Sequence, residues 1–228
     1  MIVLRRSEER RHVRSRVHDT WMSFDPDRSA DPFRRGFHAL ETLNEDLLSP
    51  EMSLYSTPRP GVDVVTYVQE GTWIRPIAGH LEAGEFERAS DPRGGRHPAP
   101  SGASAATARV FQSCITATGV ASGPALERRR FPRADREGIL RIVVSPDGRE
   151  NSLRLRQDVR LYSSVLLPGH HLIHELTEGR GAWLQVITGS VRLHDHHLRA
   201  GDGAALEVEP AVALTACEAS EILLFDLA

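Results

Sequence analysis

Two stretches of the sequence share one pattern, and this pattern decides the fold. The first is YVQEGTW at residues 67–73, followed by HLEAGE at residues 80–85, and the second is QVITGSV at residues 185–191, followed by HLRAGD at residues 197–202. In each copy an apolar strand ends at a turn glycine, a short hairpin follows, and a Leu-x-Ala-Gly-acid turn leads into the next strand. Glycine suits both turns because it tolerates positive φ. The repeat therefore predicts two related β-barrels.

Short apolar stretches rich in β-branched residues lie between turn signals along the rest of the chain. We expect strands at 62–68, 108–116, 139–144, 159–167, 182–187, 204–208, 213–217 and 222–227. Many short strands at this spacing are typical of an antiparallel sandwich or barrel, so the fold class is predicted to be all-β. The best helix candidate is 7–18, which is polar apart from Val13 and Val17.

Two irregular stretches divide the pattern. Residues 90–107 are rich in Pro, Gly, Ala and Ser without periodicity, and we expect them to form a long loop. Residues 118–136 contain several glycines and prolines and form the natural boundary between two β units. We therefore predict an N-terminal domain at 1–132 and a C-terminal domain at 133–228.

The composition excludes several classes of function. All 28 basic residues are arginine, because the chain contains no lysine. P-loop proteins, Schiff-base enzymes and protein kinases need a lysine, and the guanidinium cannot replace its amine. A net charge of -3 gives no general basic field for nucleic acid. No apolar run approaches the roughly 20 residues of a membrane span, and the N-terminus has no secretory pattern, so a cytoplasmic location is predicted.

The sequence also lacks several standard catalytic and cofactor-binding motifs. It contains no Gly-x-Ser-x-Gly, His-Glu-x-x-His or Gly-x-Gly-x-x-Gly motif, so standard hydrolase, zinc-protease and dinucleotide sites have no support. Cys114 and Cys217 lie among small or apolar neighbours, and we expect both to be buried structural thiols. A redox role of Cys114 is the alternative, although no cation lies next to it in sequence to lower its pKa.

The strand, glycine, hairpin and Ala-Gly-acid pattern resembles that of cupin domains, and two copies in tandem imply a bicupin. The order and spacing typical of the pirin family are found in the first half at Ser23-Phe24, Asp25, Asp31-Pro32, Gly36-Phe37, 43–46 and 65–71. In the second half, residues 152–159 with Leu167-Pro168-Gly169 resemble the second cupin of pirin-like proteins. The resemblance covers most of the chain and implies two tandem cupin (double-stranded β-helix, jelly-roll) barrels.

Pirins resemble quercetin 2,3-dioxygenases, and typical members hold one iron in the N-terminal cupin through three histidines and a glutamate. Aligned on the flanking strands, the first two histidine positions fall on Thr57 and Arg59, the third falls on His97, and the glutamate position falls on Ala99. One ligand of four is retained. A non-haem iron site needs at least two histidines and a carboxylate, so the resemblance implies loss of the site and no metal cofactor.

In place of a metal, we expect a polar pocket in the N-terminal barrel. Its predicted lining residues are Thr57, Arg59, Asp63 and His97, and an organic anion is the expected ligand. Asp63 keeps the acidic position just after the first motif and is available to pair with Arg59. The alternative is that these residues form a surface with no ligand.

A second group of potential ligands follows the turn at Pro168: His170, His171, His174 and Glu175. The cupin ligand positions of this barrel instead fall on Leu176, Glu178 and Ala182, which cannot form a three-ligand site. His194 and His196 occupy the hairpin turn of the second repeat, where solvated histidines hold a metal only adventitiously. We therefore expect a metal-free C-terminal cupin.

These observations favour a non-catalytic pirin-like bicupin that binds a small organic ligand or a protein partner and serves in regulation. The first alternative is a metal-dependent enzyme resembling quercetin 2,3-dioxygenase, in which His97 and ligands from the loops rebuild an iron site. The second is a redox-responsive interaction module that uses Cys114. None of the three is expected to contact nucleic acid or a membrane.

Overall fold

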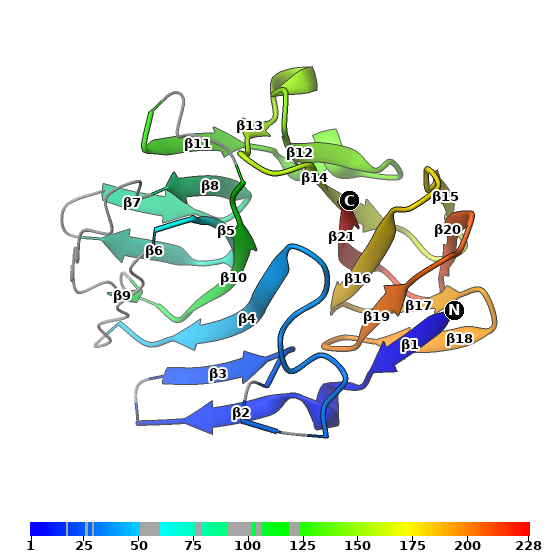
Figure 1. The fold of residues 1–228 in the computed structure, drawn as a ribbon. Coiled ribbons are helices and arrows are strands. Elements are labelled where there is room, and N and C mark those ends of the chain that lie inside the picture. The colour runs from blue at the N-terminus through cyan, green and yellow to red at the C-terminus, as the bar shows by residue number, and fades with distance from the viewer. Residues whose placement is uncertain are drawn as a thin grey trace.

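The computed structural model describes residues 1–16, 18–25, 27–28, 30–50, 60–75, 79–90, 102–103, 106–118 and 124–228. Over these residues the chain is built from strands, which form two seven-stranded sheets, one four-stranded sheet and one three-stranded sheet (Figure 1). The predicted all-β class is confirmed. Within these ranges no helix has the length and apolar character that crossing a membrane requires.

The N-terminal barrel combines a seven-stranded and a three-stranded sheet. In spatial order the large sheet contains β11 (Leu126–Arg130), β8 (Glu85–Ser90), β5 (Val62–Glu70), β10 (Ala108–Thr116), β4 (Leu40–Leu48), β3 (His18–Met22) and β2 (Arg11–Arg14). The small sheet contains β7 (Gly79–Glu82), β6 (Thr72–Arg75) and β9 (Gly102–Ala103). An apolar cluster joins the two sheets: Leu48, Val68, Trp73, Leu81, Ala108 and Val110.

The C-terminal barrel pairs the other seven-stranded sheet with the four-stranded one. Its large sheet contains β1 (Ile2–Arg5), β19 (Gly203–Leu206), β16 (Gly181–Thr188), β21 (Ser220–Leu227), β14 (Val159–Leu166), β12 (Arg141–Ser145) and β13 (Leu153–Arg154). The smaller sheet contains β15 (His171–Glu175), β20 (Ala211–Ala216), β17 (Ser190–Leu193) and β18 (His196–Arg199). The helical turns are η1 (Ser7–Glu9), α1 (Arg133–Arg136) and η2 (Arg149–Asn151).

The two large sheets pack against each other through the main core of the molecule. This core draws Val65, Tyr67 and Phe111 from the N-terminal sheet and Trp183 and Phe225 from the C-terminal one. Aromatic rings contact each other edge to face within it, an arrangement that adds about 0.5–1.5 kcal/mol per pair to the effect of burial. In each barrel, the inner face of the large sheet therefore faces the interior of that barrel, and the outer face packs against the other barrel.

The repeat that predicted the fold is present in the backbone. Gly71 (φ 77°) directly follows β5 and Gly189 (φ 73°) directly follows β16, and a two-stranded hairpin comes after each glycine. A Cβ atom would lie 2.6 Å from the carbonyl oxygen of Thr107 at Gly71, and 2.2 Å from that of Ala219 at Gly189. Both positive φ and close backbone approach thus require glycine at these turns.

The helix expected at 7–18 is wrong. After the short turn η1, residues Arg11–Arg14 form β2, which pairs antiparallel with β3 at the edge of the large sheet. A helix here would have almost no apolar face to bury, and isolated helices of this length are marginal in water. The sheet edge instead supplies backbone hydrogen-bond partners.

The first strand lies in the C-terminal barrel. β1 pairs antiparallel with β19, with Ile2 opposite Leu206 and Arg5 opposite Gly203. From β1 the chain crosses to β2, builds the N-terminal barrel, and returns through α1 to the second barrel. The division of the sequence between residues 132 and 133 stays a prediction.

Candidate functional site

A row of polar side chains crosses the inner face of the N-terminal large sheet. The strand register places Glu87 opposite Thr66, Thr66 opposite Gln112, and Gln112 opposite Asn44. Residues directly opposite one another on neighbouring strands project from the same face. Val68, two positions from Thr66, belongs to the apolar cluster that joins the two sheets of this barrel. The row therefore faces the barrel interior.

The row is buried and carries an unpaired donor. Thr66 and Glu87 are 3% and 1% exposed, and the Nε of Arg128 donates to the Oε2 of Glu87 at 2.6 Å. The Nε2 amide of Gln112 is buried and has no hydrogen-bond partner among the residues described. Buried polar groups are nearly always paired in folded proteins. This amide is therefore suited to an acceptor atom of a ligand.

The interior of the C-terminal barrel has the opposite character. Buried apolar side chains fill it: Leu166, Leu176, Ala182, Leu184, Val186, Val191, Leu193, Leu198, Ala204, Leu206, Val212, Leu214, Ala216, Ile222 and Leu224. A close-packed apolar core has neither the space nor the polar groups that a polar ligand needs. The candidate ligand-binding barrel is therefore the N-terminal one.

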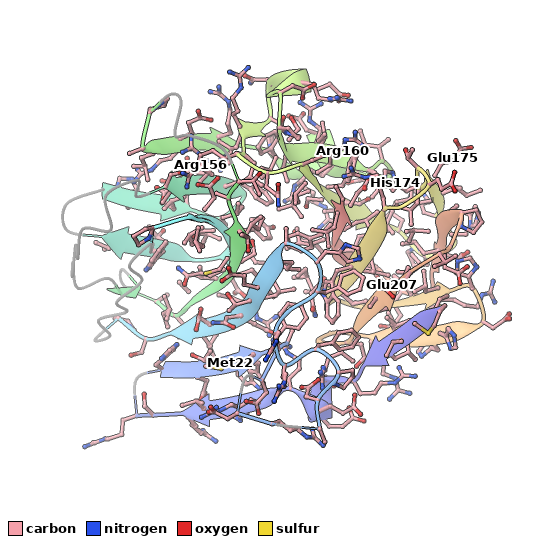
Figure 2. The ribbon with its side chains drawn as sticks, in the orientation of Figure 1. Met22, Arg156, Arg160, His174, Glu175 and Glu207 are labelled. Carbon is pink, nitrogen blue, oxygen red and sulfur yellow. The ribbon has the colours of Figure 1, made fainter. Side chains whose placement is uncertain are left out.

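Asp63 lies on β5 and projects from the face opposite to Thr66, since the two positions differ by an odd number of residues. Its carboxylate is completely buried. It accepts hydrogen bonds from the Nη2 and Nε atoms of Arg156 at 2.7 and 3.0 Å and from the hydroxyl of Ser90. Arg156, labelled in Figure 2, follows β13 in the C-terminal half. This ion pair joins the two halves of the chain.

The other predicted pocket residues, Thr57, Arg59 and His97, lie outside the residues that the structure describes, as does Ala99. In sequence, the first two fall between β4 and β5, and the last two fall between β8 and β9. Their place in a pocket stays a prediction, whereas the carboxylate of Asp63 is held by Arg156 on the opposite face of β5.

The two cysteines differ from each other in exposure. Cys114 lies on β10 opposite Val64, so it is on the same inner face as Gln112, and it is half-buried. Cys217 is exposed in the turn after β20, so the expectation that both thiols are buried is wrong for Cys217 and holds only in part for Cys114. Its apolar neighbours belong to the end of β20, whereas the thiol itself follows the strand. Neither cysteine forms a disulfide.

One histidine of the predicted second ligand group, His174, makes a structural contact. The Nε2 of His174 lies 3.0 Å from the Oδ2 of Asp226, whose other oxygen accepts from the Nε of Arg180 (Figure 2 labels His174). Burial alone would raise the pKa of Asp226, but the hydrogen bonds from His174 and Arg180 lower it. His194 lies in the predicted hairpin turn between β17 and β18, and His196 is the first residue of β18. No group of three potential metal ligands occurs in the described part of the chain.

A buried polar cluster links the two barrels through Tyr67, Arg136, Ser163 and Glu221. The Nη1 of Arg136 donates to Glu221 at 2.6 Å, to Ser163 at 2.9 Å and to the Tyr67 hydroxyl at 3.1 Å, and that hydroxyl donates to Glu221. Burial, reinforced by the charge of Glu221, raises the pKa of Tyr67, so the phenol stays protonated at neutral pH. The cluster fixes how the outer faces of the two large sheets meet.

The polar row of the N-terminal barrel is the site feature that the sequence did not predict. The residues two positions before and two positions after Thr66 are apolar, and the same is true of Gln112. Each is therefore a polar interruption of an apolar strand face. That interruption is the available signal. This signal indicates a site only when the strand register is known, because the register places the residues opposite one another.

Comparison with known proteins agrees with this architecture. A family model described as the quercetinase C-terminal cupin domain matches residues 142–227. The quercetin 2,3-dioxygenase of Escherichia coli (strain K12) is 33% identical over 231 residues, which cover 100% of this chain and 99% of that protein. A pirin-like protein of Caulobacter vibrioides is 28% identical over 203 residues, with 87% of each chain covered.

The match extends to solved structures. The bacterial pirin YhhW of Escherichia coli, crystallised in complex with nickel(II), has a TM-score of 0.87 and 32% identity to this chain, and the match covers 100% of this chain and 99% of that one. A relative with this identity over the full length, a matching cupin model and the same fold establish the family. This chain belongs to the pirin family of cupin proteins.

Proposed function

We propose that this chain is a non-catalytic pirin-family protein whose N-terminal barrel binds a small organic anion, and which acts in regulation through that ligand or a protein partner. The observation that carries the proposal is the enclosed polar row with the buried, unpaired Nε2 donor of Gln112. The Thr66 hydroxyl lies next to it on the same face. A ligand that accepts hydrogen bonds, such as a carboxylate, satisfies such donors.

The residues present do not fit the iron site that the family pattern implies. Thr57, Arg59 and Ala99 supply no imidazole or carboxylate at three of the four ligand positions, and only His97 keeps a donor. The permanent charge of Arg59 opposes a bound cation and favours an anion. The carboxylate of Asp63 is already held in an ion pair by Arg156. No oxygenation step through iron follows from this donor set.

The main alternative is a metal-dependent dioxygenase, which the name of the 33% identical relative favours. It requires ligands other than the missing ones to join His97.

A redox-responsive module based on Cys114 is supported by the position of the thiol on the inner face of the barrel. Its test is whether peroxide oxidises Cys114 faster than a model thiol, and equal or slower oxidation removes it.

Metal analysis separates the binding protein from the enzyme. Untagged protein, expressed in medium supplemented with iron and nickel, should contain far less than one metal per chain and should not consume quercetin in air. The positive control is the triple variant Thr57→His, Arg59→His, Ala99→Glu, which restores the family donor set and should take up metal. Stoichiometric metal in the wild-type protein that is lost in His97→Ala would overturn the proposal.

Anion binding is tested with benzoate as the probe. NMR titration of the wild-type protein should give saturable shifts at Thr66 and Gln112, and Arg59→Gln should weaken binding by about 10-fold or more, the loss expected for one charge-assisted hydrogen bond. Arg192→Gln, on the exposed part of β17, is the matched control and should leave binding unchanged. Absence of saturable binding, or equal binding to Arg59→Gln, contradicts an anion pocket built on Arg59.

A further inference from the structure

Two cavities of about 320 and 430 Å³ adjoin on the outside of the C-terminal barrel. His38 and Glu207 line both of them, so this pair stands where the cavities meet. The Nε2 of His38 lies 3.4 Å from the Oε1 of Glu207. The volumes of the two cavities fall within the range of small-molecule sites.

The imidazole of His38 is held in place by the fold. The residue has a left-handed φ of 51° within the tight turn between Phe37 and Leu40, a conformation that is uncommon for a side chain other than glycine. Its Nδ1 lies 3.3 Å from the backbone oxygen of Ala228. A Cβ at Gly181 would lie 2.7 Å from the His38 Nε2, so that glycine provides the space that the ring occupies.

These contacts determine which atom of His38 faces the cavities. The oxygen of Ala228 engages the Nδ1 of His38, so the Nε2 is the ring nitrogen that faces Glu207. The facing Glu207 carboxylate is a hydrogen-bond acceptor. A cationic donor placed in the cavities is complementary to it.

The charges around the cavities point to the same chemistry. Glu178 and Glu207 have no arginine partner among the residues described. Glu209 pairs with the amino group of Met1. Arg180 lines the larger cavity, but its guanidinium is shared between Asp226 and Asp158, so it is not available to a ligand. Apart from His38 and the two paired cations, the charged groups of the lining are therefore acidic.

The remaining walls are apolar. Phe33 and Phe37 line the smaller cavity, and Leu176 and Val208 line the larger one. Val208 is 95% exposed and has a φ of 60°, a strained conformation for a β-branched residue. Strained residues of this kind cluster at functional sites. An exposed apolar side chain beside a groove offers contact area to an apolar ligand.

We propose that these adjoining cavities form a second ligand site, for a small organic cation with an aromatic or apolar body, whose amine or amidine group donates to Glu207 beside His38. The apolar body packs against the phenylalanine wall. This site goes beyond the proposed anion pocket and does not depend on it, because no residue of the one belongs to the other.

The test uses benzamidine as the probe, titrated into the wild-type protein and followed by 1H–15N NMR. Saturable shifts are expected at Gly181 and at 207–209. Glu207→Gln should weaken binding by about 10-fold or more, as expected for loss of a charged acceptor. Glu218→Gln, an exposed glutamate in the turn after β20, is the matched control and should leave binding unchanged.

Two further arms fix the chemistry of the ligand. Benzamide, the uncharged analogue, should show no saturable binding at these positions, and Gly181→Ala should weaken benzamidine because the new Cβ displaces the His38 ring. Equal binding of benzamide and benzamidine, an unaffected Glu207→Gln variant, or shifts confined to other surfaces would each overturn the proposal. If benzoate does not bind to the N-terminal pocket, the proposal of this second site is unaffected. If benzamidine does not bind here, the proposal of the anion pocket is unaffected.

Discussion

Replacement of Arg136 by methionine should destabilise the protein through the cluster between the barrels. The Arg136 side chain is 5% exposed and that of Glu221 is 10% exposed, so both charges are nearly removed from water. The Nη1 of Arg136 makes hydrogen bonds of 2.6 and 2.9 Å to Glu221 and Ser163. Arg136→Met removes them and leaves the Glu221 carboxylate buried without a cation.

Removal of one partner of a buried ion pair costs about 3–5 kcal/mol, because the remaining charge keeps its desolvation penalty. In a chain of this size, 1 kcal/mol corresponds to roughly 2–4 °C, so Arg136→Met should lower the melting temperature by roughly 6–20 °C. Urea denaturation gives the free energy of unfolding directly. Arg149→Met is the matched control, since Arg149 and Asp147 are 50% and 51% exposed and such pairs contribute about 1 kcal/mol or less.

A double variant isolates the charge effect from the loss of packing. Arg136→Met combined with Glu221→Leu removes both charges, and we expect it to recover at least about 2 kcal/mol relative to the sum of the single variants. A loss below about 1 kcal/mol for Arg136→Met, or additive effects in the double variant, would refute the role of a desolvated ion pair at this interface.

Three more perturbations test other parts of the structure. Asp63→Asn should lower the free energy of unfolding by about 3–5 kcal/mol in urea, because it leaves a largely buried guanidinium unpaired; an unchanged midpoint contradicts this. Because the pKa of Asp226 is lowered in the folded protein, its contribution to stability is present above pH about 4 and is lost as the pH falls through the folded value. Asp226→Asn should therefore flatten this acid-side loss in urea titrations at successive pH values. Gly189→Ala should lower the melting temperature more than Gly179→Ala, since both have positive φ but only the former meets backbone atoms.

The sequence was sufficient for the fold because the decisive signals are local. The turn glycines at Gly71 and Gly189, with the apolar strands before them, report backbone conformations that only glycine adopts without strain. The stretch at 7–18 has no such signal. Its conformation depends on pairing with β3 and on the sheet edge, which are properties of the assembled molecule.

The candidate site was less accessible to sequence reasoning. Asp63 could be selected as the acid that follows the first family motif, but its partner Arg156 is 93 residues away in the chain. The polar row needs the register of several strands, and a shift of one residue would turn Thr66 to the opposite face. Long-range pairing of this kind leaves no periodic pattern along a single strand.

The position of β1 has a consequence for the order in which the protein assembles. Ile2 pairs with Leu206, so the strand is synthesised about 200 residues before its partner. At a synthesis rate of about 5–20 residues per second, this strand waits roughly 10–40 s while the N-terminal barrel emerges and gains its own core. Closure of the second large sheet is thus a late event that recruits a strand synthesised long before its partner.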